Sequence, residues 1–320
     1  MPESVTATAH PNIALVKYWG KRPGPGNIPA TPSLSVTLDA LTTTTTIRVA
    51  AVDRVVLDGV TVADAKIDGF LRGLREQFDI PPLEIDTGSD FPAGCGLASS
   101  ASGFAALITA IDAALDLGLS AQERSDWARR GSGSAARSIV GGFGALHERD
   151  GQWLAEELLP PGAWPLRVVI GITSRTRKSV GSTEGMERSR LTSPFYGSWV
   201  RETPADFATA RAAVAARDFG ALARIAEASC LKMHALMLSS EPGLLYWNGA
   251  TVEALHRIRE IRNGGTAVFF TVDAGPQVKA VCTPDHATAV SAALADVPGV
   301  EEVLVSALGP GAVCGTGAGA

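Results

Sequence analysis

The stretch that most restricts the fold is residues 88–115, GSDFPAGCGLASSASGFAALITAIDAAL. Its first ten residues are rich in glycine and proline and predict a loop, whereas the small and apolar residues of 98–115 predict a buried helix. A loop that opens into a helix presents free backbone N–H groups and the positive end of the helix dipole, which suit a phosphate. A glycine-rich turn that only enters a tightly packed helix explains the spacing equally well. The candidate phosphate-binding residues are Gly94, Gly96, Leu97, Ala98, Ser99, Ser100 and Ser102.

This loop matches neither of two common nucleotide-binding motifs. The chain contains no G-x-x-x-x-G-K-[ST] sequence, which excludes a P-loop, and no G-x-G-x-x-G sequence, which disfavours a dinucleotide fold. A phosphate site here would have to rely on backbone N–H groups and serine hydroxyls.

A second loop of small residues follows at 129–142, RRGSGSAARSIVGG. Ser132, Gly133 and Ser134 can form a nest of backbone N–H groups, and Arg137 can bind a carboxylate or phosphate with two parallel hydrogen bonds. The alternative is a flexible turn with a solvated arginine. Taken alone, the loop does not decide between the two.

The N-terminal segment 10–22, HPNIALVKYWGKR, places Lys17, Lys21 and Arg22 around Tyr18 and Trp19. It is either a cationic wall for an anionic substrate or a set of surface lysines beside a core tryptophan. Two small-residue loops together with a basic segment favour a site that holds several phosphates.

Hydrophobic periodicity predicts two α+β halves that meet near residue 160, as domains 1–162 and 163–320. Turns are expected at Pro204, Asp218 and Pro242-Gly243, and the glycine-rich end 315–320 is expected to fray. Ser120 is the predicted N-cap of a helix that runs to Arg130. The other predicted helices are 65–78, 98–115, several within 193–262, and 284–294; the predicted strands are two within 33–50, then 83–86, 167–173, 267–275, 278–282 and 301–308.

Composition excludes several classes of protein. The 320 residues carry a net charge of -5, which disfavours a broad basic face and hence a nucleic-acid partner. No apolar run approaches the ~20 residues that span a bilayer, and the N-terminus lacks a secretory-signal pattern, so no membrane association is expected. Four widely spaced cysteines, without metal-ligand spacing, predict reduced thiols in a cytoplasmic protein.

Five segments together resemble the diphosphomevalonate decarboxylase family of the GHMP kinase superfamily, in that family's order over about residues 9–276. They are NIALVKYWGK with SLSVTL (12–21 and 33–38), FPAGCGLASSASG (91–103), ARRGSGSAARSIVGGF (128–143), GSTEGM with TSP (181–186 and 192–194), and FFTVDAGP (269–276). The resemblance implies an α+β fold with an N-terminal half like ribosomal protein S5 domain 2 and a ferredoxin-like C-terminal half. It also implies an active cleft between the halves.

The implied reaction converts mevalonate 5-diphosphate and ATP to isopentenyl diphosphate, CO2, ADP and phosphate. ATP is required because a tertiary hydroxyl is a poor leaving group until it is phosphorylated. Phosphate then leaves as the carboxylate releases CO2. Mg²⁺ is expected with the ATP phosphates, although the sequence does not identify its ligands. The family also implies a homodimer.

The resemblance implies four catalytic residues. Asp273 would lie against the substrate 3-hydroxyl, with Lys17 beside it; Arg137 would hold the carboxylate, and Ser182 would approach the transferred phosphoryl group. Ser99, Ser100 and Ser102 would hold the ATP phosphates. The implied substrate-binding residues are Tyr18, Lys21, Ser132, Gly133, Ser134 and Arg137, with Arg72 as a further anion contact for which Arg75 competes.

Some positions depart from the family pattern. Thr31-Pro32 stands where an Asn-Ser pair is common, and Thr183 stands where some bacterial members have arginine. The number of phosphates on the substrate is therefore left open. Alternatives are a mevalonate 5-phosphate decarboxylase, a mevalonate 3-kinase, and, from another class, a non-catalytic ligand-binding regulator on a kinase-like scaffold.

Overall fold

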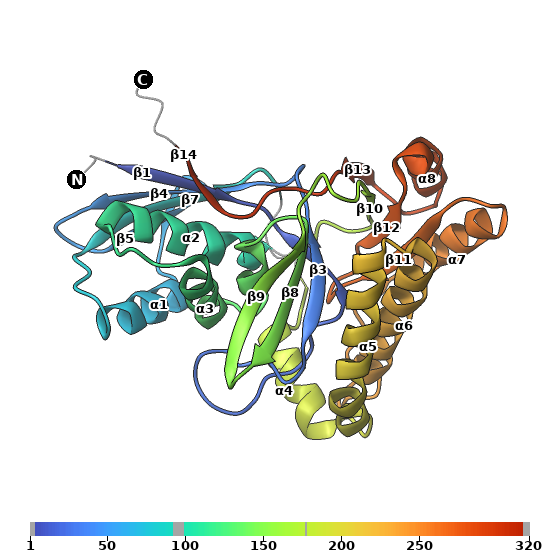
Figure 1. Ribbon diagram of the computed structural model, residues 1–320, viewed down its shortest axis with the longest axis horizontal. Coiled ribbons are helices and arrows are strands. Elements are labelled where there is room, and N and C mark those ends of the chain that lie inside the picture. The colour runs from blue at the N-terminus through green and yellow to red at the C-terminus, as the bar shows by residue number, and fades with distance from the viewer. Residues whose placement is uncertain (1–3, 92–98, 177, 316–320) are drawn as a thin grey trace.

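The computed structural model describes residues 4–91, 99–176 and 178–315. Within them the strands form one six-stranded sheet and two four-stranded sheets, with helices packed around them (Figure 1). The six-stranded sheet has the order β14 (Val313–Gly315), β1 (Val5–Ala9), β4 (Thr43–Val49), β7 (Leu83–Ser89), β5 (Arg54–Leu57) and β6 (Val60–Val62). Its neighbouring strands are antiparallel except β5 and β7.

The threonine run of β4 shows why this sheet forms. Thr43, Thr45 and Ile47 are buried, whereas Thr44 and Arg48 are exposed, which is the alternation of a strand with one wet face. The apolar residues of α2 (Ser99–Leu115) pack on the buried face, together with α1 (Ala65–Arg75) and α3 (Ala121–Gly131). The buried helix predicted from the sequence is thus confirmed.

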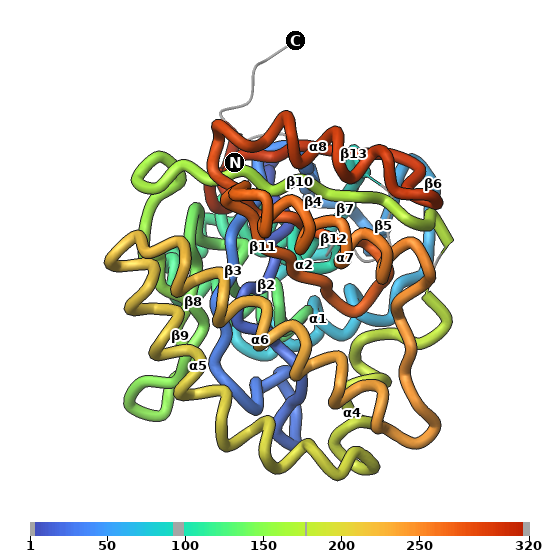
Figure 2. The backbone as a smooth tube through the Cα atoms, turned by 90° about the vertical axis from the view of Figure 1, so that its right-hand side faces the viewer, coloured from blue at the N-terminus to red at the C-terminus, as the bar shows by residue number. Residues whose placement is uncertain are grey.

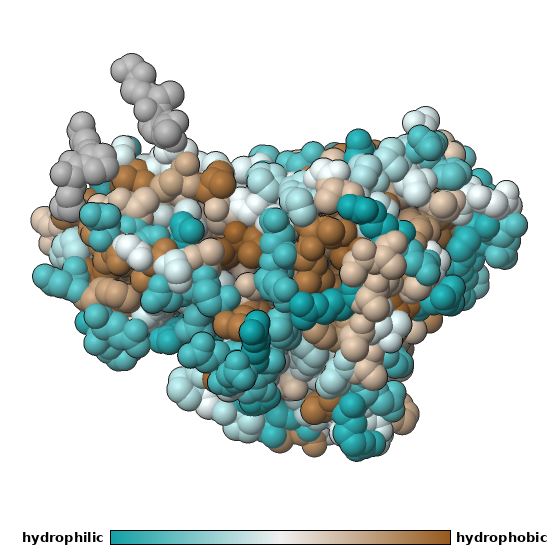
Figure 3. Space-filling view, in the orientation of Figure 1, coloured by the Kyte–Doolittle hydropathy of each residue, from teal (hydrophilic) through white to brown (hydrophobic). Residues whose placement is uncertain are grey.

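The second sheet is antiparallel and carries the N-terminal basic segment. Its order is β2 (Asn12–Val16), β3 (Ser33–Thr37), β8 (Phe143–Arg149) and β9 (Gln152–Leu159), with a short 3₁₀ helix at Ala135–Ser138 before β8. On the face shown in Figure 3, hydrophobic residues gather near the centre, where Figure 1 draws this sheet beside α5 (Tyr196–Ala216).

The third sheet is antiparallel and ends beside the second. Its order is β11 (Val268–Val272), β12 (Val278–Cys282), β10 (Arg167–Ile172) and β13 (Glu302–Ser306). Figure 2 shows α5 and α6 (Phe219–Leu238) running alongside each other, and α6 packs on both β2 and β11. Thr271 Oγ1 in β11 donates to the carbonyl of Ala14 in β2 at 3.3 Å, so these two strands are in contact. The other helices are α4 (Ser182–Thr192), α6 (Phe219–Leu238), α7 (Gly249–Asn263), a 3₁₀ turn (Pro284–His286) and α8 (Ala287–Ala295).

Helix ends follow the predicted capping chemistry in two places. Ser120 caps α3 with a complete capping box that includes Glu123. Asp218 caps α6 through the backbone N–H of Ala221, so the predicted turn there is confirmed. The predicted turn at Pro204 is wrong, because this proline lies inside α5. An internal proline costs about 3 kcal/mol, and the burial of Trp199, Phe207 and Val214 on the same helix offsets it.

The carboxyl end returns to the N-terminal half. β14 pairs with β1, so Gly315, predicted as part of a frayed tail, lies in a strand; residues 316–320 lie outside the described part of the chain. The domain boundary between residues 162 and 163 stays a prediction. No helix among the described residues is long and apolar enough to cross a membrane.

Candidate active site

Lys17 and Asp273 meet at the ends of two strands from different sheets. Lys17 follows β2 and Asp273 follows β11, and Lys17 Nζ donates to Asp273 Oδ1 at 2.5 Å. Helix α6 holds both backbones. Ser229 Oγ accepts from the Lys17 N–H at 2.9 Å, and Cys230 Sγ accepts from the Val272 N–H at 3.2 Å. The pair is therefore fixed by the fold.

A second lysine lies on the other oxygen of the same carboxylate. Lys279 Nζ on β12 is 3.3 Å from Asp273 Oδ2. Burial alone would raise the pKa of Asp273, but the charges of Lys17 and Lys279, together with the hydrogen bond from Lys17, hold it well below its usual range. Asp273 therefore stays ionised throughout the physiological pH range.

Arg137 is buried and held by neutral partners. Its Nε donates to Asn12 Oδ1 at 3.1 Å, and its Nη1 donates to Ser33 Oγ at 2.6 Å. Burial lowers the pKa of Arg137 to about 10, and the charge of Asp273 is among the groups that oppose this. The guanidinium is thus cationic at neutral pH, and the flexible turn with a solvated arginine is ruled out.

Tyr18 lies beside Arg137 and Gly133, which both belong to the second small-residue loop. The Arg137 guanidinium is 5.9 Å from the centre of the Tyr18 ring. A Cβ added to Gly133 would lie 2.0 Å from the Tyr18 hydroxyl, so only glycine fits there. That hydroxyl is buried without a hydrogen-bond partner among the described residues, and burial raises its pKa above the usual range. It is a neutral donor suited to an anionic ligand.

The two small-residue loops approach each other through serines. Ser100 Oγ at the start of α2 lies 3.2 Å from Ser132 Oγ, which lies 3.4 Å from Ser134 Oγ. Ser102 differs, because its hydroxyl is fully buried and bonded to Thr43 Oγ1 and the Ser99 carbonyl. Contact with a phosphate would require Ser102 to give up these bonds, so its assignment stays a prediction. Gly94, Gly96, Leu97 and Ala98 lie outside the described residues.

Ser182 begins helix α4, and Lys178 ties it to the Asp273 turn. Lys178 Nζ donates to Ser182 Oγ at 2.8 Å and to the Ala274 carbonyl at 3.0 Å. Burial lowers the pKa of Lys178 to about 8, only partly opposed by the charge of Asp273. Lys21 reaches the same helix, because its Nζ donates to Thr183 Oγ1 at 3.0 Å.

Helix α1 approaches the lysines at its N-terminal end. After burial, the charge of Lys66 is a further cause of the lowered pKa of Lys21. Arg75 is committed elsewhere, since it makes two 2.7 Å bonds to Asp53 and contacts two backbone carbonyls. Arg72 is exposed and remains the anion contact predicted on this helix.

Four site residues were missed by the sequence analysis. Lys279 is a single lysine in the apolar stretch VKAVC, and a charge inside a buried strand could have identified it. Lys178 lies just before the GSTEGM motif, and this closeness to the motif could have identified it as a site residue. Asn12 and Ser33 hold Arg137, but nothing local in the sequence connects them to it.

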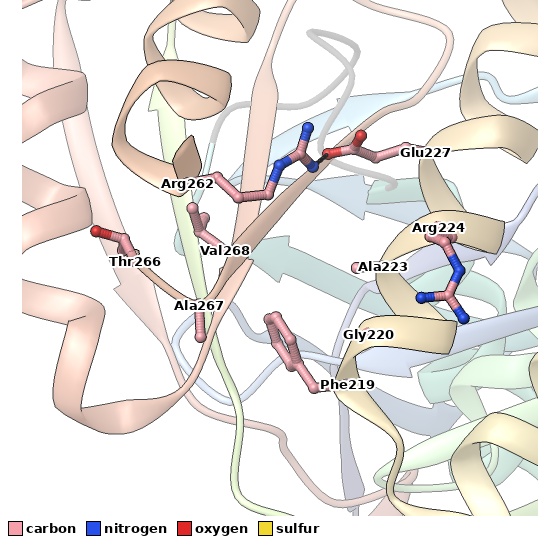
Figure 4. Close-up of a pocket in the computed structure, with 9 residues that line it drawn as sticks. All are labelled: Phe219, Gly220, Ala223, Arg224, Glu227, Arg262, Thr266, Ala267 and Val268. Carbon is pink, nitrogen blue, oxygen red and sulfur yellow. Dashed lines mark hydrogen bonds and ion pairs between the residues drawn. The ribbon is translucent and has the colours of Figure 1, made fainter. Parts of the chain in front are cut away.

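Two hollows lie near these elements. One of about 370 Å³ is bordered by Lys178, Tyr246 and Pro276, next to the Asp273 turn. The other, of about 350 Å³, lies between the start of α6 and the residues before β11 (Figure 4). In it Arg262 points toward Glu227, with 2.6 Å between Nη1 and Oε1, and no predicted site residue lines it. Among the described residues, no three His, Cys, Asp or Glu side chains are grouped as a metal site.

Two family models match most of the chain. The diphosphomevalonate decarboxylase-like N-terminal domain matches residues 9–153, and the mevalonate 5-diphosphate decarboxylase C-terminal domain matches residues 168–307. Diphosphomevalonate decarboxylase mvd1 of Aspergillus fumigatus is 36% identical over 301 residues, which are 85% of this chain and 74% of that protein.

Solved structures agree with these matches. Mevalonate diphosphate decarboxylase from Staphylococcus aureus is 34% identical with a TM-score of 0.91, and the match covers 98% of both chains. A structure described as MDDEF in complex with MVAPP, AMPPCP and magnesium is 37% identical with a TM-score of 0.90, covering 97% of this chain and 98% of that one.

Proposed function

Because this chain belongs to the diphosphomevalonate decarboxylase family, we propose that it decarboxylates mevalonate 5-diphosphate to isopentenyl diphosphate in an ATP-dependent reaction of the mevalonate pathway. CO2, ADP and phosphate are the other products. The fold is the α+β architecture of GHMP kinases. One observation carries the proposal: Lys17, Arg137 and Asp273, far apart in sequence, form one charged cluster.

Asp273 orients the substrate 3-hydroxyl for attack on the terminal phosphoryl group of ATP. Its low pKa makes it a weak base, so it accepts the hydroxyl proton late, as a loose phosphoryl-transfer transition state permits. Lys17 stabilises negative charge that develops beside it. Arg137 binds the substrate carboxylate and aligns the C–C bond that breaks when CO2 leaves.

The remaining polar groups bind phosphate. Tyr18 and Lys21, with Ser132, Gly133 and Ser134, bind the substrate diphosphate, and the unpaired Tyr18 hydroxyl supports this role. Ser99 and Ser100 at the start of α2 face the ATP phosphates. Lys178 and Ser182 approach the transferred phosphoryl group from the start of α4. Magnesium enters with ATP and neutralises its phosphates.

A substrate panel tests the function directly. Mevalonate, its 5-phosphate and its 5-diphosphate are each incubated with ATP and Mg²⁺, and ADP and CO2 are both measured. We expect equal amounts of ADP and CO2 from the 5-diphosphate. ADP without CO2 would indicate a 3-kinase, and CO2 from the 5-phosphate alone would indicate the monophosphate enzyme. Ligand binding without any turnover would indicate a regulator.

The rate should depend on the charge of Lys178. Because its pKa is about 8, kcat/KM, which reports the free enzyme, is expected to fall as pH rises through about 8. Bound phosphate favours the ammonium form of Lys178, so the corresponding alkaline fall in kcat is expected at a higher pH than that in kcat/KM. Lys178→Arg keeps a charge at every accessible pH and is expected to remove the limb. An unchanged alkaline limb in this variant would assign it to another group.

The protein is also proposed to be a cytoplasmic homodimer. The exposed apolar side chains of Leu191, Phe195 and Leu245 support association. The free thiols of Cys230, Cys282 and Cys314 support a reducing compartment. Light scattering after size exclusion tests the dimer, and cell fractionation tests the location.

A further inference from the structure

Lys279 reaches the catalytic carboxylate because of strand register. It lies directly opposite Thr271 in the antiparallel β11–β12 pair. Asp273 follows two residues after Thr271, so it belongs to the same face of the sheet, and such a diagonal neighbour is within reach of a long side chain. The result is one ammonium for each oxygen: Lys17 on Oδ1 at 2.5 Å and Lys279 on Oδ2 at 3.3 Å.

The two lysines come from different parts of the chain. Both side chains are buried, with 1% exposed for Lys17 and 0% for Lys279, whereas the Asp273 side chain is 25% exposed. Lys17 belongs to the N-terminal segment that carries Tyr18 and Lys21, whereas Lys279 lies within a strand whose five residues are all buried. Lys279 therefore meets Asp273 from the protein interior.

Two buried lysines share a single carboxylate; burial lowers the pKa of Lys279, and the charge of Asp273 opposes this. Burial of a charge is costly unless it is paired, and Asp273 pairs with both Lys17 and Lys279. Lys17 can shift toward a developing negative charge without leaving Asp273 unpaired, provided that Lys279 stays in place.

We propose that Lys279 is a positioning residue, which holds Asp273 ionised and oriented through Oδ2 and so frees Lys17 to stabilise the reacting oxygen. This inference rests on the proposed function and gives the two lysines different roles: Lys279 positions Asp273, and Lys17 stabilises the reacting oxygen. Lys279 acts through Asp273 and does not touch the substrate.

Other groups around Asp273 leave this assignment intact. From helix α6, His234 and Cys230 contact the Val272 backbone; burial lowers the pKa of His234 to about 3 and raises that of Cys230, so both are neutral near pH 7. Lys178 and Arg137 add positive charge from the segment before α4 and from the second small-residue loop. Among the described residues, Lys17 and Lys279 are the cations that contact the carboxylate itself.

The test is the pH dependence of the variant Lys279→Met, with CO2 release as the assay. We expect kcat to fall by about 100-fold, as for a displaced catalytic group, while KM for both substrates stays within threefold. Loss of a close positive charge raises a carboxyl pKa by about 1–3 units, so the acid limb of kcat should move upward correspondingly. Lys232→Met, which removes a lysine paired with Asp206 on α5, is the matched control and should leave kcat and the limb unchanged.

Several results would overturn the proposal. An unchanged acid limb with kcat within twofold of wild type would reduce Lys279 to a packing role. A large rise in KM at constant kcat would mean direct substrate contact.

If Lys279→Met does not fold, Lys279→Gln is measured with the same expectations. If neither folds, the ¹³C carboxyl signal of Asp273 in the wild-type protein decides: no change is expected between pH 7 and 4, whereas an ordinary aspartate with a pKa of about 3.9 would be nearly half protonated at pH 4. Absence of CO2 from the wild-type enzyme would instead refute the proposed function.

Discussion

Asp273→Asn is expected to lower kcat by about 10³-fold or more. This size is expected because the variant loses the usual contributions of both proton transfer and charge stabilisation. Asparagine keeps the size of the side chain but removes the charge that Lys17 and Lys279 both contact. The reacting hydroxyl then loses its acceptor, and Lys17 and Lys279 lose the carboxylate that they both contact. ATP-dependent CO2 release measures the effect.

The control for this variant is Asp206→Asn on α5. Asp206 also pairs with a lysine, Lys232, at 2.9 Å, but away from the site. Its replacement should leave turnover unchanged. Circular dichroism and thermal unfolding must show that Asp273→Asn is folded, because the uncompensated lysines also destabilise the native state. Wild-type turnover in a folded Asp273→Asn protein would refute the role assigned to this residue.

Local chemistry made much of the fold predictable. Ser120 and Asp218 have the side chains that cap helices, and both cap one. Strands were predicted within residues 33–50, and β4 lies there with one buried and one wet face. The turn predicted at Pro204 was wrong because packing along the whole of α5 outweighs the local preference of proline. A short stretch of sequence does not show that packing.

The site was less predictable because it depends on contacts across the chain. Motif order brought Lys17, Arg137 and Asp273 to attention, but the burial of Arg137 depends on Asn12 and Ser33, which are more than a hundred positions away. Lys279 required the register of β11 and β12, which places it opposite Thr271. Sequence spacing contains neither kind of information.

Arg137→Lys is expected to lower kcat/KM by about 100-fold or more. Loss of one partner of a buried charged contact costs about 2–5 kcal/mol, and each 1.36 kcal/mol is tenfold in rate. Lysine keeps the positive charge but lacks the planar fork that donates to Asn12 and Ser33 at the same time as to a carboxylate. The charge would remain without the alignment.

The ratio of products identifies which step Arg137 serves. If it holds the carboxylate for release of CO2, the variant should form more ADP than CO2 in single-turnover experiments with mevalonate 5-diphosphate. Arg129→Lys is the matched control, because Arg129 is also buried but bonds to the Gly26 carbonyl and Asp126 instead. It should keep ADP and CO2 equal. A folded Arg137→Lys enzyme with wild-type kcat/KM would show that the carboxylate is held elsewhere.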